Sequence, residues 1–331
     1  MLLLGLLLLA AGLVGVTAGS IMLSPLAILG ELVAWVVPHA PVSRLPEAEA
    51  TILWMTRLPR VMLAMVVGGG LAVVGATLQA VFRNPMADAG LLGVGSGGAF
   101  GAVLAVHLGW GHGVFFALPL SAFAGALLAL GAVYALAHLR GTPTLHGLLL
   151  TGIAVGAFMS AGTSVFLVAT EEYRVKTVLF WLAGGLEGRS WTHLQAACLF
   201  ILPGVGLLTL LARPLDLLSL GEEEAASLGL PVHVTRLAML TLSALVAGAA
   251  TAVAGAIPFV GLVAPHALRP LVGSRARHLL PAALVGGALL VVLADVGART
   301  VSGRYDLPLG ALTSFIGAPY FLLALRGQED R

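Results

Sequence analysis

The chain has 331 residues and a formal net charge of +2, and 59% of its residues are hydrophobic while only 10% are charged. Its mean hydropathy is +1.03, whereas roughly a quarter of the residues in a typical soluble domain are charged. This composition excludes an ordinary soluble domain and indicates a protein that crosses a membrane several times. The one cysteine, Cys198, excludes a disulfide within the chain and argues against a cysteine-based metal site.

Long apolar runs indicate helices, because only helices and closed barrels satisfy their backbone within lipid, and a helix needs roughly 20 apolar residues to cross. The first run is also compatible with a signal peptide, but no Lys or Arg precedes it, which favours a span. An even number of spans places both termini on one side. The sequence predicts ten spans, at about 2–23, 61–82, 92–109, 114–138, 145–168, 191–212, 236–255, 257–271, 279–298 and 307–325.

The boundary between the seventh and eighth predicted spans is the least certain. The segment 255–270 contains two glycines and three prolines that shorten or break a helix. Orientation is also undecided by charge, since nine arginines would lie on the side of the termini and eight Lys or Arg residues on the other. These eight either meet an acidic partner or extend to lipid headgroups from helix ends. They are Arg44, Arg57, Arg60, Arg174, Lys176, Arg189, Arg299 and Arg304.

Several function classes lack their motifs. There is no GxxxxGK[ST] loop and only one lysine, Lys176, so the chain is not itself a nucleotide-hydrolysing motor of that type. The absence of HExxH and the scattered histidines argue against an intramembrane metalloprotease. The glycine-rich segment 90–102 follows no predicted strand, so we expect it to allow close helix packing and not to bind a dinucleotide.

Asp295 is the only acid well inside a predicted span. Ion-coupled transporters need ionisable groups near the membrane midplane, but Asp295 lies four residues before Arg299 near a helix end. Such a pair is more simply structural. A carrier driven by a proton or sodium gradient therefore has little to work with.

Three consecutive glutamates, Glu222 to Glu224, stand between the sixth and seventh predicted spans. Ser219 is placed to cap a short helix with Glu222 three residues later, and acids in the first turn suit the helix dipole. Gly229 is suited to end the helix in a left-handed conformation, and Pro231 prevents its continuation. The pattern predicts a compact helix of two turns over 219–229, preceded by a shorter helical piece from Pro214. The alternative is a solvated loop.

Seven ordered segments between about residue 52 and the C-terminus resemble permease subunits of binding-protein-dependent ABC importers for ferric siderophores, haem and cobalamin. They are RLPRVMLAMVVGGGLAVVGATLQAVFRNPMADAGLLGVGSGGAFGA (57–102), FWLAGGLEGRSW (180–191), LSLGEEEAASLGLPV (218–232), GAIPFVGLVAPHALRPLVG (255–273), RHLLP (277–281), LADVGART (293–300) and DLPLGALTSFIGAPYFLLAL (306–325).

The resemblance implies one all-α transmembrane domain over 1–331, with about ten spans and short cytoplasmic coupling helices, paired with a second copy around a central channel. The implied partners are two cytoplasmic ATPases, which bind ATP and magnesium, and a periplasmic or lipid-anchored binding protein, with no nucleic acid. The chain itself is expected to bind no cofactor or metal, to have no catalytic residue, and to lie in the bacterial inner membrane with both termini cytoplasmic. The resemblance does not distinguish whether the substrate is a siderophore, haem or cobalamin.

The resemblance also implies roles for residues. Segment 214–231 is expected to contact the ATPase through Ser219, Gly221, Glu222, Glu223, Glu224 and Gly229. Arg57, Arg60 and Arg299 are expected to face acids of the binding protein, whereas Arg304 matches no family position. Channel and gate positions are Asn84, Met86, Thr144, Leu145, His146, Ser160, Thr163 and Ser164.

His146 departs from the family pattern, in which a small or basic residue stands. A histidine there either contacts a haem iron or is a solvated loop residue. Two other classes remain as alternatives: an ion-coupled secondary transporter acting alone, and a scaffold or sensor, which would need neither glycine-dense spans nor the helical loop.

Overall fold

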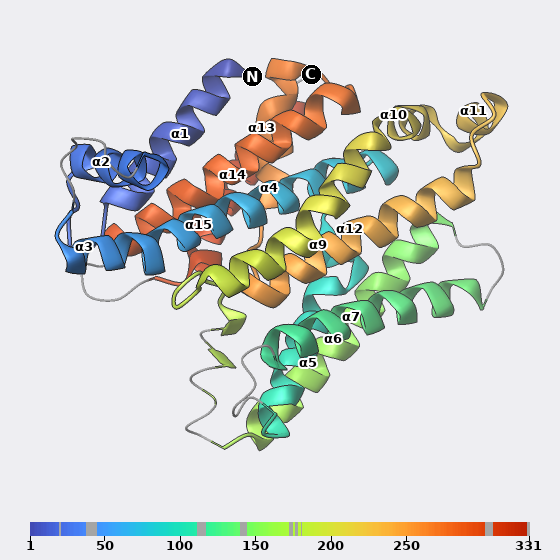
Figure 1. Cartoon of the computed structure of the whole chain (residues 1–331). Coiled ribbons are helices and arrows are strands. Elements are labelled where there is room, and N and C mark those ends of the chain that lie inside the picture. Colours follow the sequence, from blue (N-terminus) through green and yellow to red (C-terminus); the bar gives the residue numbers. More distant parts are fainter. Residues whose placement is uncertain are drawn as a thin grey trace.

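The computed structural model describes residues 1–19, 21–37, 45–110, 117–139, 144–171, 175, 178–179, 181–301 and 307–329, with only the backbone for 146 and 323–329. All regular elements in these ranges are helices (Figure 1), which confirms the all-α prediction. They are α1 (Leu2–Thr17), α2 (Pro25–Val36), α3 (Glu47–Ile52), a π turn (Leu53–Arg57), α4 (Leu58–Val81), a 3-10 turn (Ala89–Leu92), α5 (Val94–His107), α6 (Ala117–His138), α7 (Leu145–Ala169), α9 (Trp191–Leu210), α10 (Ala212–Leu220), α11 (Glu222–Ser227), α12 (Val232–Ala254), α13 (Val260–Val272), α14 (Ala276–Thr300) and α15 (Leu309–Glu329).

Each of the ten predicted spans contains one of these helices. Six helical stretches in the described residues are long and apolar enough to cross a membrane by themselves. They are Glu47–Val81, Ala117–His138, Gly147–Ala169, Trp191–Leu210, Val232–Ala254 and Ala276–Thr300. The other four predicted spans contain shorter apolar helices, which are α1, α5, α13 and the described Leu309–Leu322 part of α15.

Two N-terminal helices, α2 and α3, were not predicted. With 12 residues, α2 is too short for a span, and Pro25 begins it at a position where a missing N–H costs nothing. Its Trp35 is exposed and its ring lies 5.9 Å from that of Trp54, centroid to centroid. This contact places α2 beside the start of the long α3–α4 stretch.

Helix α4 runs through the middle of the bundle (Figure 1). Of the apolar part of Glu47–Val81, the stretch that contains α4, 78% is buried. Its glycines allow this, because a Cβ at Gly68 would collide with the backbone of Gly287 in α14, and one at Gly75 with the backbone of Gly261 in α13. Small residues that let helices approach are typical of membrane bundles. The backbones of α4, α13 and α14 therefore pack directly on one another.

The uncertain boundary between the seventh and eighth spans is a short break. Helix α12 ends at Ala254 and α13 begins at Val260. Gly255 and Phe259 both have positive φ, +69° and +66°, and the left-handed backbone is unusual for a bulky residue such as Phe. The side chain of Phe259 packs where Gly317 leaves room, since a Cβ there would clash with it.

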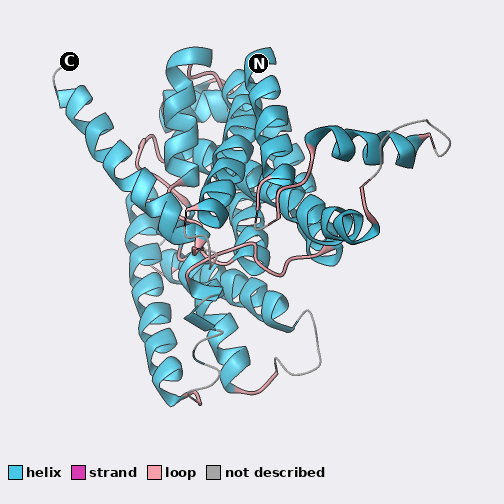
Figure 2. Ribbon diagram, turned by 90° about the vertical axis from the view of Figure 1, so that its left-hand side faces the viewer, coloured by secondary structure: helices cyan, strands magenta, loops and turns pink. Residues whose placement is uncertain are grey.

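Both views place the two chain ends at the same end of the bundle (Figures 1 and 2). In Figure 1, α10 and α11 lie at this end as well. This arrangement agrees with termini that share a side with the predicted coupling segment.

Candidate functional site

The predicted coupling segment folds as two short helices, α10 and α11, between α9 and α12. Both helices have buried apolar side chains, Leu215 and Leu218 on α10 and Ala225 on α11, which hold the pair against the bundle. Gly221 joins the two helices with φ +141°. A Cβ at this position would collide with the Glu224 carboxylate, so only glycine makes this turn without displacing that side chain.

The structure corrects the predicted start of the glutamate helix. Ser219 does not cap it, since its hydroxyl donates to the carbonyl of Asp216 at 2.6 Å and lies in the last turn of α10. The N-cap residue of α11 is Gly221, which has no side chain to offer. The preceding helix is also longer than α11, nine residues against six, and begins at Ala212 before Pro214.

The predicted end of this helix is confirmed. Gly229 has φ +82°, its N–H bonds the carbonyl of Ala226 at 2.9 Å, and the N–H of Leu230 bonds that of Ala225 at 3.0 Å. This pattern satisfies the last carbonyls of the helix. The glutamate helix is therefore ordered and not an irregular loop, but it spans only Glu222–Ser227 and not the two turns predicted over 219–229.

The three glutamates lie in the first turn of α11 and are exposed, where negative charge is favourable. Glu222 forms an ion pair with Arg236 of α12, whose side chain is buried. Glu223 and Glu224 have no ion pair within the described residues. Glu222 therefore anchors α11, and Glu223 and Glu224 add exposed negative charge to it.

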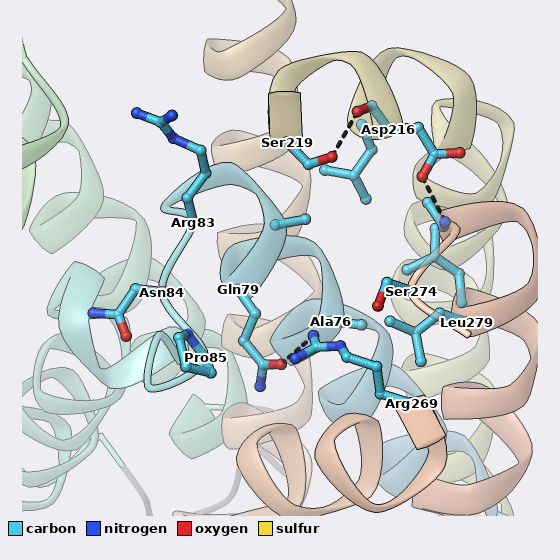
Figure 3. Close-up of a pocket in the computed structure, with 14 residues that line it drawn as sticks. Ala76, Gln79, Arg83, Asn84, Pro85, Asp216, Ser219, Arg269, Ser274 and Leu279 are labelled. Carbon is cyan, nitrogen blue, oxygen red and sulfur yellow. Dashed lines mark hydrogen bonds between the residues drawn. The ribbon is translucent and has the colours of Figure 1, made fainter. Parts of the chain in front are cut away.

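A pocket of about 320 Å³ opens beneath α10 (Figure 3). Two polar links cross its walls, and neither was predicted from the sequence. The Asp216 carboxylate accepts a hydrogen bond from the N–H of Ala276, the first residue of α14, at 2.7 Å. The pocket is lined by Ala76, Gln79, Ala80, Arg83, Asn84, Pro85, Leu215, Asp216, Ser219, Arg269, Ser274, Ala276, Leu279 and Leu280.

The second link joins α4 to α13. The side-chain amide of Gln79 donates to the carbonyl of Gly261 at 3.0 Å, and its oxygen accepts from Arg269 at 2.9 Å (Figure 3). Gln79 lies two residues before the end of α4. The same pocket thus connects α10, α14, α13 and the part of the chain that continues into residues 83–86.

The predicted gate residue Asn84 lies on this pocket wall. Its side-chain oxygen accepts from the N–H of Met86 at 2.8 Å, and the preceding Arg83 has φ +48°. Met86 is exposed. Asp88 then caps the 3-10 turn by accepting from the N–H of Gly90 at 2.6 Å. Burial raises the pKa of Asp88, and the hydrogen bond from Gly90 only partly offsets this rise. The turn holds residues 83–86 in one defined loop.

The second predicted gate segment begins α7. Thr144 caps this helix by accepting from the N–H of Gly147 at 3.1 Å, and Leu145 is half-buried. The side chain of His146 lies outside the described part of the structure, so the two interpretations of this histidine both stand. Along α7, a Cβ at Gly152 would collide with the carbonyl of Leu91, which packs α7 against the 3-10 turn.

The predicted channel residues lie farther along α7. Ser160 and Ser164 are exposed and Thr163 is half-buried. The hydroxyls of Ser164 and Thr163 donate to carbonyls of the same helix, those of Ser160 at 3.1 Å and Met159 at 2.8 Å. Only 17% of the apolar part of α7, within Gly147–Ala169, is buried. The helix therefore leaves a broad face open, with small hydroxyl side chains on it.

The three predicted docking arginines are not an exposed rim. Arg57 is 5% exposed, and its guanidinium donates to the carbonyls of Val16 and Thr17, both at 2.7 Å, and to that of Ile21. Arg299 donates to Ala18 at 3.1 Å and to Gly15 at 2.9 Å. Apart from that of Ile21, these carbonyls lie at the C-terminal end of α1, where a helix has no internal donors left. Arg44, Arg174, Lys176 and Arg304 lie outside the described residues.

Asp295 joins the same cluster. Arg60 approaches its carboxylate at 2.9 Å and Arg299 at 3.1 Å, and the Asp295 side chain is 2% exposed. The predicted i, i+4 pair of Asp295 and Arg299 is confirmed. The contact with Arg60 was not predicted and ties α4 to α14.

The all-helical fold, with six stretches of the described residues long and apolar enough to cross a membrane, is that of a multi-pass membrane protein. The FecCD transport family matches residues 6–327. This chain belongs to the FecCD transport family, whose members are permease subunits of ABC importers, and these work with ATPase and binding-protein partners.

Relatives and solved structures agree with this assignment. The chain is 44% identical over 287 residues to the cobalamin import system permease protein BtuC of Halobacterium salinarum, covering 86% of this chain and 76% of that protein. It is 43% identical over 284 residues to the hemin transport system permease protein HmuU of Yersinia pestis, covering 84% and 85%. The Fe(3+)-citrate import system permease protein YfmE of Bacillus subtilis is 35% identical over 98% of this chain and 94% of its own.

A solved structure described as an inward-facing conformation of a metal-chelate type ABC transporter superposes with a TM-score of 0.86. It is 30% identical, and the match covers 98% of this chain and 97% of that one. The fold of the whole described chain is therefore that of an ABC permease.

Proposed function

We propose that this chain pairs with a second copy to form the translocation channel of an ATP-driven importer for an iron complex, a siderophore or haem, or for cobalamin. The relatives named above serve cobalamin, hemin and ferric citrate, so their names support the class of cargo and do not choose within it. The observation that carries the proposal is the α10–α11 segment, which is bonded into the bundle and presents an acidic surface.

The two short helices are suited to transmit motion. A partner ATPase that moves α10 would pull on α14 through the bond from Ala276 to Asp216. It would also act on the end of α4 across the shared pocket, whose wall includes Asn84, and Asn84 in turn bonds the N–H of Met86. The residues proposed to contact the ATPase are Ser219, Gly221, Glu222, Glu223, Glu224 and Gly229. Nucleotide-driven closure of the ATPases thereby reaches the gate.

The channel is proposed to form between the two copies. The open face of α7, with Ser160, Thr163 and Ser164, supplies a wall of small hydroxyl groups without strong ligands. A weakly binding wall suits cargo that must leave again. Asn84, Met86, Thr144, Leu145 and His146 are proposed to narrow the cytoplasmic end.

ATP and magnesium are assigned to the partner ATPases, and this chain is proposed to bind no cofactor. A periplasmic or lipid-anchored binding protein would deliver the cargo to the outer face, with both termini cytoplasmic and the protein in the inner membrane. Arg57, Arg60 and Arg299 already form hydrogen bonds or ion pairs within the chain. The acids of the binding protein would therefore have to contact them while these bonds remain. Arg60 is the best placed, because it lines a pocket at the end of α4 opposite α10 and α11.

The gradient-driven carrier is not favoured by the structure. Asp295, the acid it would need, already forms ion pairs with Arg60 at 2.9 Å and with Arg299 at 3.1 Å, so both partners of its carboxylate come from this bundle. Reconstitution separates the two functions. The chain alone in liposomes should move no cargo under a proton or sodium gradient, and uptake should begin when the ATPase, the binding protein and ATP are added. Gradient-driven uptake by the lone chain that Asp295→Asn removes would contradict the proposal.

A further inference from the structure

A second pocket, of about 270 Å³, lies at the opposite end of α4 from α10 and α11. Its floor is the turn between Trp181 and Arg189, which leads into α9. Its other walls come from the starts of α4, α6 and α15. The lining residues are Arg60, Leu118, Trp181, Gly184, Gly185, Leu186, Glu187, Gly188, Arg189, Leu307, Pro308 and Leu309.

Two side chains that line this pocket each carry a hydrogen-bond donor that is buried without an acceptor. The indole N–H of Trp181, a residue only 7% exposed, and the Nε of Arg189 have no partner within the residues that the structure describes. The other described contact of the Arg189 side chain joins its Nη1 to Nε2 of His193 at 3.3 Å. Buried donors without acceptors cost about 1–3 kcal/mol each, so a ligand that accepts from both is favoured.

The charge around this pocket is positive. Burial lowers the pKa of Arg189, and no neighbouring carboxylate offsets this effect. Arg60 also lines the pocket, and the carboxylate that it contacts, Asp295, is shared with Arg299. Glu187 is the one acid among the lining residues, and it is exposed and forms no described ion pair with Arg189. The pocket therefore has more donors and positive charge than its own residues balance.

The turn that carries these donors is fixed in place. The carbonyl of Gly184 accepts from the N–H of Leu309 at 2.9 Å, and the N–H of Gly185 bonds Ala254 at 2.8 Å. Gly184 has φ +72°, and a Cβ there would collide with the carbonyl of Ala256. The pocket is thus formed before any ligand arrives, which lowers the cost of binding.

We propose that this pocket binds a carboxylate, held by the indole N–H of Trp181 and the guanidinium of Arg189. A planar guanidinium suits a carboxylate, and a charged acceptor makes the stronger hydrogen bonds. The carboxylate belongs either to an acidic side chain of a protein at the outer face or to a small molecule. The inference does not rest on the transport function, because the chain alone forms the pocket.

The test uses the full chain in lipid nanodiscs with ¹⁵N-labelled indole groups. The sequence contains five tryptophans, and Trp181→Phe assigns the resonance of Trp181. Replacing the other four one at a time assigns it by elimination if Trp181→Phe does not fold. Sodium acetate should shift this resonance downfield in a saturable manner, and sodium chloride at the same ionic strength should not.

Arg189→Gln should weaken acetate binding by about tenfold, as expected for the loss of one charge-assisted bond. Arg213→Gln, an exposed arginine on α10, is the matched control and should leave it unchanged. A binding protein that shifts the Trp181 resonance and competes with acetate identifies a protein side chain as the source, and competition by free cargo identifies a small molecule. No shift with acetate, or an equal shift with chloride, would overturn the proposal and leave a hydrated pocket.

Discussion

Asp216 on α10 accepts a hydrogen bond from the backbone N–H of Ala276 at 2.7 Å, and this bond ties α10 to the first turn of α14. A carboxylate at a helix N-terminus satisfies a free N–H and interacts favourably with the dipole. Because α14 also packs backbone to backbone on α4 at Gly287 and Gly68, a displacement of α10 is passed to the two helices at the centre of the bundle.

Asp216→Ala should cost about 0.5–2 kcal/mol of stability, the range for loss of a helix cap. It should lower uptake more than it lowers ATP hydrolysis, because the ATPase contact remains while the link to α14 is lost. Asp216→Asn retains an acceptor and is the matched control. Uptake and hydrolysis that fall together, to the same extent in both variants, would show that the bond is structural only.

Asp295→Ala should be strongly destabilising, by about 3–5 kcal/mol, because it leaves the buried arginines without their carboxylate. Thermal unfolding in detergent measures this loss. The double variant Arg60→Leu with Asp295→Leu should recover part of it, since no unpaired charge of that pair remains. A single variant with wild-type Tm would contradict the buried contact of Arg60 with Asp295.

Gly75→Ala should destabilise the fold by about 1–3 kcal/mol, the usual cost of overpacking, because its Cβ would meet the backbone of Gly261. Gly131→Ala in α6 is the control. No atom lies within 4 Å of a Cβ there, and alanine is the better helix former. Equal Tm values for the two variants would show that α4 and α13 can separate at Gly75.

The proposed docking of a binding protein on Arg299 makes a kinetic prediction. Arg299→Gln should slow association, most clearly at 0.01 M salt, where the Debye length is about 30 Å. The variant should also lower Tm, because Arg299 bonds the carbonyls that end α1. An association rate that responds neither to salt nor to the substitution would leave Arg299 with its structural role alone.

The apolar runs were sufficient to predict the ten principal helices, because the length and composition of a span are strongly constrained by lipid. Helix α2 was not predicted, because 12 residues are too few for a span and Glu31 interrupts its apolar pattern. The start of α11 was misassigned because Ser219 and Gly221 are both acceptable N-cap residues. The backbone angle of Gly221, which decided between them, is set by packing.

Contacts between distant segments could not be predicted. Spacing pairs Asp295 with Arg299, but Arg60 is 235 residues away from Asp295, and Asp216 is 60 residues from Ala276. The arginines that satisfy the end of α1 could not be told from exposed ones, because an arginine near a helix end suits both roles. The role of Gln79 could not be predicted, because its partners Gly261 and Arg269 lie on α13 and are far away in the sequence.

The account depends most on the claim that α11 couples ATP hydrolysis to uptake, and the number of cargo molecules moved per ATP hydrolysed tests it directly. The double variant Glu223→Lys with Glu224→Lys reverses the outward charge and leaves the pair of Glu222 and Arg236 intact. Glu47→Lys with Glu49→Lys, on α3, is the control of equal charge. In proteoliposomes with the ATPase, the binding protein and ATP, we expect the ratio to fall several-fold in the α11 variant and to stay at the wild-type value in the control. A wild-type ratio in the α11 variant, with the ATPase still bound, would contradict the account.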